Sequence, residues 1–175
     1  MYTTHDPAFV SVSRFDDIHT VAVVRGEKQH TTVHSSSLAE LKKKEAFRRA
    51  CRCRADESIR KELEHKCQGE QNEGFFADRI ILVEGSTESY ALPVYFARLG
   101  YDLDENNTVI LRAQSKTLLQ LLCVIFSSCK IPCYCIFDGD KPEDSLYSRY
   151  MTSQPMSSGE PVSYTHLRAH ETCAD

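Results

Sequence analysis

The chain has 175 residues, a formal net charge of −4 and a hydrophobic fraction of 41%. This length suits one domain with a substantial core, and the charge excludes a globally basic nucleic-acid-binding protein. The first residues lack the basic and apolar regions of a secretory signal, so we expect a cytoplasmic protein with reduced cysteines. Residues 118–137 are apolar, but Gln120, Lys130 and Pro132 interrupt them. This favours a buried helix and strand over a membrane span, and we expect no membrane contact.

Two β-rich runs near the start of the chain, residues 19–25 and 29–34, predict a hairpin. Because a two-stranded hairpin is not stable alone, we expect residues 1–35 to be the end of a larger domain. Residues 37–68 predict one helix that begins with a capping box formed by Ser37 and Glu40. Its basic first half indicates either a solvated, salt-bridged face or a DNA-contact patch. The polar residues 68–74 predict a linker.

The cysteine and histidine pairs of this helical region are a weak zinc signal. Cys51 and Cys53 are separated by one residue, as are His65 and Cys67. Structural zinc sites use wider spacings, so ordinary reduced thiols are the favoured interpretation.

Residues 75–141 alternate between short apolar runs and helical patterns. We expect strands at 80–83, 108–112 and 131–137, and helices at 87–99 and 115–128. Pro93 is expected to kink the first helix or to mark a short first segment. The βαβαβ order predicts an α/β fold with a parallel sheet and right-handed crossovers.

Acidic residues follow the first and third of these strands. Glu84 ends the first strand and Glu88 lies one helical turn further, while Asp138 and Asp140 flank a glycine after the third. Because the carboxyl ends of parallel strands share one edge, we expect the four acids to lie together. Their hard oxygen ligands suit Mg²⁺ or Mn²⁺, and two such ions would serve phosphodiester displacement. The alternative is that these acids only cap helices and face water.

These motifs carry a family resemblance. The pair Glu84-Gly85, followed later by Asp138-Gly139-Asp140, resembles the Toprim domain of topoisomerases, primases, RecR-type recombination proteins and OLD-family nucleases. The longer motif from Val83 to Glu88, with Pro93 beyond it, resembles the OLD (overcoming lysogenization defect) branch. The resemblance implies a Rossmann-type sheet and metal-dependent DNA cleavage. It assigns Glu84, Glu88, Asp138 and Asp140 as metal ligands, with Glu84, Asp138 and Asp140 catalytic.

The resemblance extends weakly to two further places. Residues 3–7 are similar to the histidine switch loop of the ABC-type ATPase domain that precedes Toprim in this family, which implies that His5 is a remnant of that site. The family carries a glycine-rich turn with a lysine after the middle strand. Here Lys116 matches and the glycines do not, so a phosphate contact by Lys116 and a merely solvated lysine stay open. ATP and a homodimer are expected only in the full-length parent.

The C-terminal residues 162–172 correspond to the in-frame translation of a common transposase sequencing adapter. We therefore expect an ATPase-domain remnant at 1–35, a helical linker at 36–74, an incomplete Toprim domain at 75–160 and adapter-derived sequence at 161–175. The parent is expected to be a DNA endonuclease, and the fragment weak or inactive. The alternatives are a non-catalytic Toprim-like nucleic-acid-binding module and another Toprim enzyme of the primase or topoisomerase type.

Overall fold

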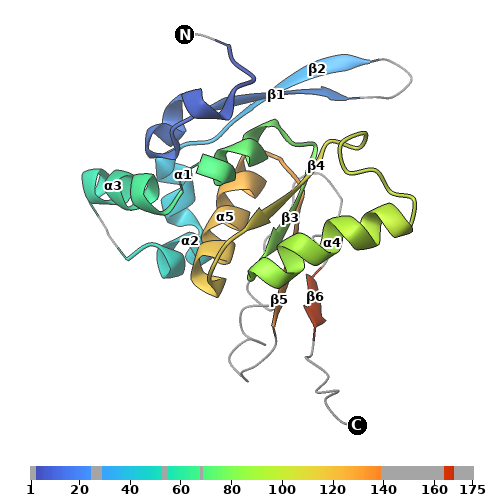
Figure 1. The fold of residues 1–175 in the computed structure, drawn as a ribbon. Helices are drawn as coiled ribbons and strands as arrows, with labels where there is room; N and C mark the ends of the chain where they lie inside the picture. The colour runs from blue at the N-terminus through green and yellow to red at the C-terminus, as the bar shows by residue number, and fades with distance from the viewer. Residues whose placement is uncertain (1–2, 25–28, 53–54, 68, 139–163, 168–175) are drawn as a thin grey trace.

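A parallel β-sheet forms the centre of the molecule (Figure 1). The structure is a computed structural model and describes residues 3–24, 29–52, 55–67, 69–138 and 164–167. The strands are β3 (Arg79–Val83), β4 (Thr108–Arg112), β5 (Cys133–Asp138) and β6 (Tyr164–Leu167), in the order β4-β3-β5-β6. All neighbouring strands in this sheet are parallel. The predicted α/β fold with a parallel sheet is confirmed.

Helices α4 (Ser86–Arg98) and α5 (Lys116–Ser128) connect the first three strands of the sheet. The chain passes from β3 to β4 on one side and then returns across β3 to β5. Figure 1 shows the two helices on opposite faces of the sheet, the arrangement that right-handed crossovers in opposite directions would give. The carboxyl ends of β3, β4 and β5 therefore meet at one edge, where both helices begin.

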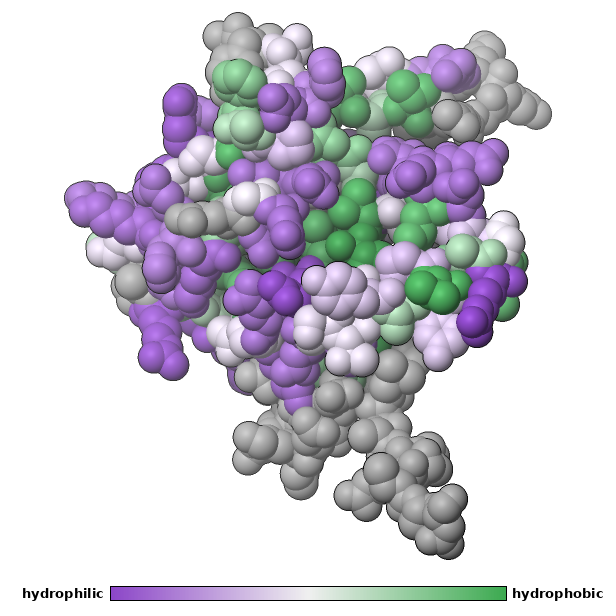
Figure 2. Space-filling model, in the orientation of Figure 1, coloured by the Kyte–Doolittle hydropathy of each residue, from purple (hydrophilic) through white to green (hydrophobic). Residues whose placement is uncertain are grey.

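The two helices are buried to very different extents. α5 is buried along most of its length, whereas no residue of α4 is buried. The large apolar side chains of Tyr90, Val94 and Tyr95 on α4, and of Leu99 at its C-cap, face solvent. Figure 2 shows this face, with hydrophobic side chains among hydrophilic ones. The helix continues through Pro93 to Arg98, so the proline does not divide it.

The N-terminal segment forms the predicted hairpin. After two 3₁₀ helices, η1 (Pro7–Phe9) and η2 (Val12–Asp17), strands β1 (His19–Val24) and β2 (His30–Ser35) pair antiparallel with Val21 opposite Val33. Val21, Val33 and Val23 share one exposed face of this hairpin. The hydroxyl of Thr20 donates to the carbonyl oxygen of Cys129 over 3.1 Å, which anchors the hairpin beside the end of α5.

The prediction of one helix over residues 37–68 is wrong. The structure has three: α1 (Leu38–Lys43), α2 (Glu45–Ala50) and α3 (Asp56–Lys66), and Lys44 between the first two has an extended backbone. The capping box of Ser37 and Glu40 is confirmed. The break lets Leu41 and Phe47 both enter the core, and α2 packs against α5. Burial of apolar side chains thus outweighs helix continuity.

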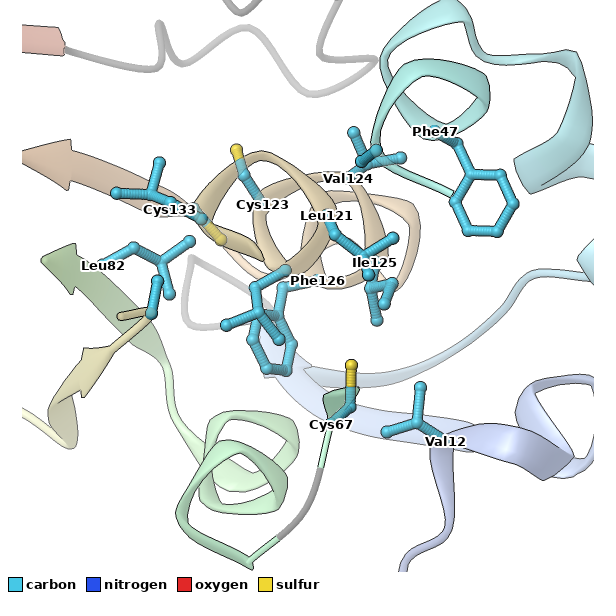
Figure 3. Packing of buried hydrophobic residues seen from close by; sticks show 14 of the residues in the cluster. Val12, Phe47, Cys67, Leu82, Leu121, Cys123, Val124, Ile125, Phe126 and Cys133 are labelled. Atoms are coloured by element: carbon cyan, nitrogen blue, oxygen red, sulfur yellow. The ribbon is translucent and has the colours of Figure 1, made fainter. Parts of the chain in front are cut away.

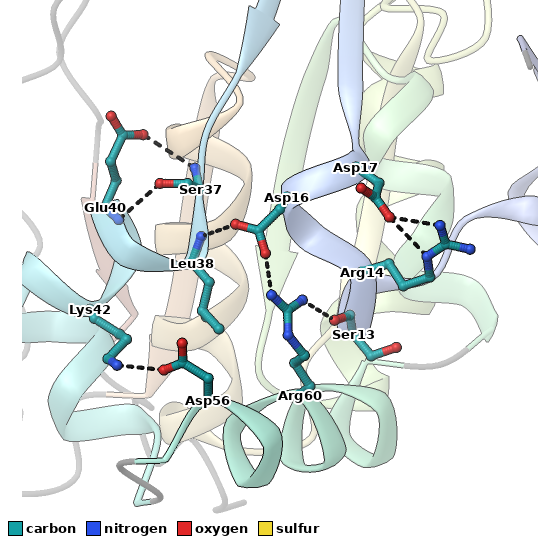
Figure 4. A network of polar contacts seen from close by, with 10 residues as sticks. All are labelled: Ser13, Arg14, Asp16, Asp17, Ser37, Leu38, Glu40, Lys42, Asp56 and Arg60. Carbon is teal, nitrogen blue, oxygen red and sulfur yellow. Dashed lines mark hydrogen bonds and ion pairs between the residues drawn. The ribbon is translucent and has the colours of Figure 1, made fainter. Parts of the chain in front are cut away.

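An ion pair and several hydrogen bonds join η2, α1 and α3 (Figure 4). Asp16 Oδ1 accepts a hydrogen bond from the backbone nitrogen of Leu38 over 2.8 Å, and Asp16 Oδ2 pairs with Arg60. Arg60 also donates to the carbonyl oxygen of Ser13 over 2.7 Å. The Arg60 guanidinium is the main reason that the pKa of Asp16 lies below its usual value.

Residues 68–74 were expected to be a polar linker, and this expectation is wrong for the part that the structure describes. Residues Gly69–Phe76 form 3₁₀ turns (η3) in which Gln71 and Asn72 are buried. The Asn72 amide donates to the carbonyl oxygen of Val10 over 2.9 Å. Gly74 lies so close to Phe126 that a Cβ there would come within 2.5 Å of the ring. Close packing against α5 and η1 therefore orders this segment.

One hydrophobic cluster runs from Val12 to Phe137 and includes side chains of α1, α2, α3, α5 and the central strands. Figure 3 shows Phe47 beside Val124 and Ile125 of α5, and Phe126 near Leu82. The core is continuous across residues 35–36 and 74–75, where we expected boundaries between segments. The idea that these segments come from different domains of a parent protein therefore stays a prediction. β6 lies in the segment attributed to adapter sequence. A sheet edge accepts an extended segment through backbone hydrogen bonds whatever its origin.

Candidate metal-binding site

Glu84 stands at the point where three strands end. Its backbone nitrogen donates to the carbonyl oxygen of Ile136 in β5 over 3.2 Å. On the other side, the carbonyl oxygen of the preceding Val83 accepts a hydrogen bond from the nitrogen of Ala113 over 2.8 Å. Hydrogen bonds to both neighbouring strands thus fix the Glu84 backbone at the carboxyl edge of the sheet.

The Glu84 carboxylate is partly buried and lies near a lysine. Its side chain is 30% exposed, but Oε2 is buried and accepts no hydrogen bond from any residue that the structure describes. Lys116 Nζ lies 3.9 Å from Oε2. This distance permits attraction between the charges and exceeds that of a normal hydrogen bond. The oxygen therefore faces a cation without direct contact.

Gly85 lets the second acid fold back over the strand end. A Cβ at Gly85 would lie 2.5 Å from Glu88 Oε2, so the Glu88 carboxylate occupies the space beside the glycine. Gly85 is the N-cap of α4, and Glu88 lies in the first turn of this helix. A carboxylate there interacts favourably with the helix dipole. The structure thus brings Glu88 to the turn that follows Glu84.

The backbone of Asp138 ends β5 beside this turn. The register pairs Val83 with Ile136, which places Asp138 one residue beyond the level of Glu84. The side chain of Asp138 and all of Asp140 lie outside the described residues. Among the residues that are described, no group of three or more acidic, histidine or cysteine side chains forms a metal cluster. The four-acid ligand set therefore stays a prediction.

Lys116 is the first residue of α5, and its side chain reaches the same edge. Ser115 caps the helix by accepting a hydrogen bond from the Leu118 nitrogen over 3.2 Å. Lys116 Nζ lies 6.0 Å from the centre of the Phe137 ring. The ammonium group therefore lies near the ends of β3 and β5, 3.9 Å from a carboxylate oxygen of one predicted ligand, Glu84.

The backbone conformation of the turn before Lys116 was not predicted from the sequence. Gln114 has a φ of 62°, in the left-handed region that glycine adopts most easily. The resemblance leads one to expect glycines in this turn. The turn thus keeps a glycine-type conformation with a glutamine side chain. The only available signal was the family pattern itself, because nothing in the residue type glutamine predicts a positive φ.

The other candidates lie apart from this edge or are explained by packing. His5 is exposed, and its neighbour Asp6 caps η1 by accepting a hydrogen bond from the Ala8 nitrogen. In Figure 1 the N-terminal segment and the carboxyl end of β5 lie at opposite ends of the molecule. The structure therefore does not bring His5 to the acidic residues.

The cysteines of the helical region are packed as ordinary thiols. Cys51 and Cys67 are buried, and Cys51 Sγ donates to Glu62 Oε2 over 3.0 Å. Burial raises the pKa of Cys67 to about 12, which disfavours the thiolate that zinc requires. His65 is exposed, and Cys53 lies outside the described residues. These observations favour the interpretation without zinc.

Ion pairs occupy part of the basic cluster. Lys42 pairs with Asp56 over 2.5 Å, and Arg49 pairs with Glu45 over 2.7 Å. These pairs favour the solvated, salt-bridged interpretation, and the DNA-contact patch stays an untested alternative.

A parallel sheet with acids at its carboxyl edge, between the N-termini of two crossover helices, is consistent with a Toprim-type α/β domain. Residues 75–140 match the family model described as "Overcoming lysogenization defect protein-like, TOPRIM domain". This part of the chain is therefore similar to the Toprim domain of OLD-like proteins. No curated protein matches the chain. The family is a nucleic-acid-related, metal-binding one.

The residues present fit a hard divalent cation. Glu84 and Glu88 offer carboxylate oxygens on either side of Gly85, and Asp138 ends the adjacent strand. Mg²⁺ and Mn²⁺ prefer such ligands. Within the described ranges, no helix combines the length and apolarity needed to cross a bilayer.

Proposed function

We propose that this chain carries the phosphodiester-cleaving site of an OLD-like DNA endonuclease, at the carboxyl ends of β3 and β5. The observation that carries the proposal is the position of Glu88, whose carboxylate folds back against Gly85, the residue that follows Glu84. This arrangement brings two acids to the edge where β5 ends in Asp138.

Each residue of the site has a proposed role. Glu84, Glu88, Asp138 and Asp140 would hold Mg²⁺ or Mn²⁺, with two ions possible, and Glu84, Asp138 and Asp140 are the proposed catalytic residues. Bound ions would supply positive charge for the attacking and leaving oxygens of the phosphodiester. Lys116 lies at the same edge and is the proposed phosphate contact. The N-termini of α4 and α5 add partial positive charge that favours a DNA phosphate there.

ATP use and assembly into a dimer are proposed for a longer parent protein. Residues 1–35 are the proposed end of an ABC-type ATPase domain, with His5 as a remnant of its switch loop. Because 161–175 are the proposed adapter sequence, we expect the fragment alone to cleave weakly or not at all.

A non-catalytic nucleic-acid-binding module is the second candidate, favoured by one observation. The turn from Arg112 to Lys116 lacks the glycines that the resemblance leads one to expect. The positive φ of Gln114 weighs against this candidate, because the backbone keeps the glycine-type shape. A primase- or topoisomerase-type Toprim enzyme is supported less well, since the matched family model is the OLD-like one.

Nicking of supercoiled plasmid tests the proposal. We expect the full-length parent to nick DNA in Mn²⁺ or Mg²⁺ but not in EDTA, and Glu84→Ala and Asp138→Ala each to abolish nicking. The matched control is Glu57→Ala, an exposed acid on α3. DNA binding without nicking by the wild-type parent would favour the non-catalytic module. Full nicking by either site variant would refute the ligand assignment.

A further inference from the structure

Lys116 occupies a place that helix electrostatics does not favour. It is the first residue of α5, where the helix dipole repels a positive charge. Its side chain is nevertheless only 18% exposed and is directed toward the end of β3. The cap of α5 is supplied by Ser115, so the lysine is not needed to begin the helix. Its position therefore requires another explanation.

The neighbouring carboxylate supplies one. Glu84 Oε2 is buried, and a buried negative charge is costly unless a positive charge lies near it. Lys116 Nζ is 3.9 Å away from this oxygen and 6.0 Å from the centre of the Phe137 ring. Attraction to Glu84 thus offsets the repulsion from the helix dipole. The 3.9 Å distance exceeds that of a hydrogen bond, so the attraction between these two charges is weaker than in a contact ion pair.

We propose that Lys116 is an internal counterion that competes with the divalent metal ion for Glu84. The inference rests on the proposed function, because it takes Glu84 as a metal ligand. Without metal, the ammonium group neutralises the carboxylate and keeps the strand end folded. A divalent ion at Glu84 brings twice the charge and repels the ammonium group, whose flexible four-carbon chain lets it turn away. Lys116 therefore sets the metal affinity of the site below what its carboxylates alone would give.

Mn²⁺ titrations of the full chain test the competition. Free Mn²⁺ is followed by electron paramagnetic resonance, with circular dichroism to show that each variant is folded. We expect Lys116→Met to lower the Mn²⁺ dissociation constant about tenfold, because one nearby positive charge is removed. Lys116→Arg keeps the charge and is expected to bind Mn²⁺ as the wild type does.

Two further variants separate this inference from the proposed function. Lys61→Met removes an equal charge from the exposed face of α3, where Lys61 pairs with Glu57, and is expected to leave Mn²⁺ affinity unchanged. Glu84→Gln is expected to weaken Mn²⁺ binding at least tenfold. If Glu84→Gln weakens binding but Lys116→Met does not tighten it, the counterion role is overturned and the metal site stands. If neither the wild type nor Lys116→Met binds Mn²⁺, both proposals fail.

Discussion

Gln114 is the residue whose backbone departs most clearly from its type. Its φ of 62° costs an L-residue with a side chain roughly 1–2 kcal/mol, whereas glycine adopts it freely. We expect Gln114→Gly to raise the free energy of unfolding by about 0.5–1 kcal/mol, since part of the gain is lost to the greater freedom of glycine in the unfolded chain. Urea denaturation followed by circular dichroism measures the change.

A second glycine substitution provides the matched control for this prediction. Ala97 is an exposed residue of α4 with an ordinary helical backbone, so Ala97→Gly is expected to destabilise the protein by about 1 kcal/mol. A loss of stability in both variants would contradict the strain assigned to Gln114.

Gly85 is the residue on which the position of Glu88 depends. An added Cβ would meet Glu88 Oε2 at 2.5 Å, and this oxygen is the far end of a flexible side chain. Gly85→Ala is therefore expected to displace the Glu88 carboxylate without unfolding the domain. We expect Mn²⁺ affinity to fall about tenfold or more, measured by calorimetric titration, with an unchanged melting temperature. Unchanged affinity would show that Glu88 is not a ligand.

For single residues, the sequence reveals the acidic residues of the candidate site better than it reveals backbone conformations. Glu84 is recognisable because it follows an apolar run, and Glu88 because its spacing from Glu84 places it in the first turn of the next helix, at the same edge. The left-handed turn at Gln114 is not recognisable, because the path from β4 to α5 imposes it. The proximity of Lys116 to Glu84 is likewise hidden, since it depends on how α5 crosses β3.

Among the secondary-structure elements, short helices α1 and α3 depend on the contacts of η2. Asp16 accepts a hydrogen bond from the backbone nitrogen of Leu38, the first residue of α1, and pairs with Arg60 of α3 (Figure 4). Because these contacts lower the pKa of Asp16 in the folded protein, they stabilise the folded protein at pH values above about 3.8, the pKa of Asp16 in the unfolded chain. This contribution is lost as the pH falls through the lower pKa of the folded state.

Asp16→Asn should therefore destabilise the protein at pH 7 but not in acid. Asparagine keeps an acceptor for Leu38 but loses the charge that attracts Arg60. The pair is about one third exposed and partly screened by solvent, so we expect a loss of about 1 kcal/mol. The difference from the wild type should be constant from pH 7 to 5, begin to shrink near pH 3.8 and disappear only below the lowered pKa of Asp16 in the folded protein.

Denaturant titrations at several pH values measure this difference. Asp17→Asn is the matched control, because Asp17 pairs with Arg14 on an exposed surface of the same 3₁₀ helix and should contribute little. A difference between Asp16→Asn and the wild type that persists unchanged at pH 3 would show that the charge of Asp16 is not responsible.

Periodicity predicted the elements of the sheet region and failed in the helical region. The strands and both crossover helices follow from apolar runs and Ser or Gly boundaries. Residues 37–68 carry a continuous helical pattern, yet the chain breaks at Lys44. The reason is tertiary, because Leu41 and Phe47 gain burial in one core only if the helix changes direction. Local propensity contains no information about that gain.

In the whole molecule, the helical region and the sheet share one core. Phe47 of α2 is almost fully buried in the cluster that also contains Leu82 and Phe126. We expect Phe47→Ala to destabilise the protein by about 3–5 kcal/mol. Hydrogen exchange measured by mass spectrometry should then show faster exchange in β3 and β5 as well as in α2.

The control for this prediction is Phe9→Ala, a truncation of an exposed phenylalanine that should change exchange in β3 little. If Phe47→Ala speeds exchange only in α1, α2 and α3, residues 36–74 form a unit separate from the sheet. That result would support a linker and would contradict a shared core.

The central claim is that a divalent metal ion binds at the carboxyl ends of β3 and β5. Nuclear magnetic resonance of the isotope-labelled full chain tests it directly, because bound Mn²⁺ broadens the signals of nearby amides. We predict that substoichiometric Mn²⁺ broadens the amides of residues 83–88, 114–117 and 136–138, and leaves those of the hairpin β1–β2 sharp. Broadening centred on any other part of the chain, or none at millimolar Mn²⁺, would contradict the claim.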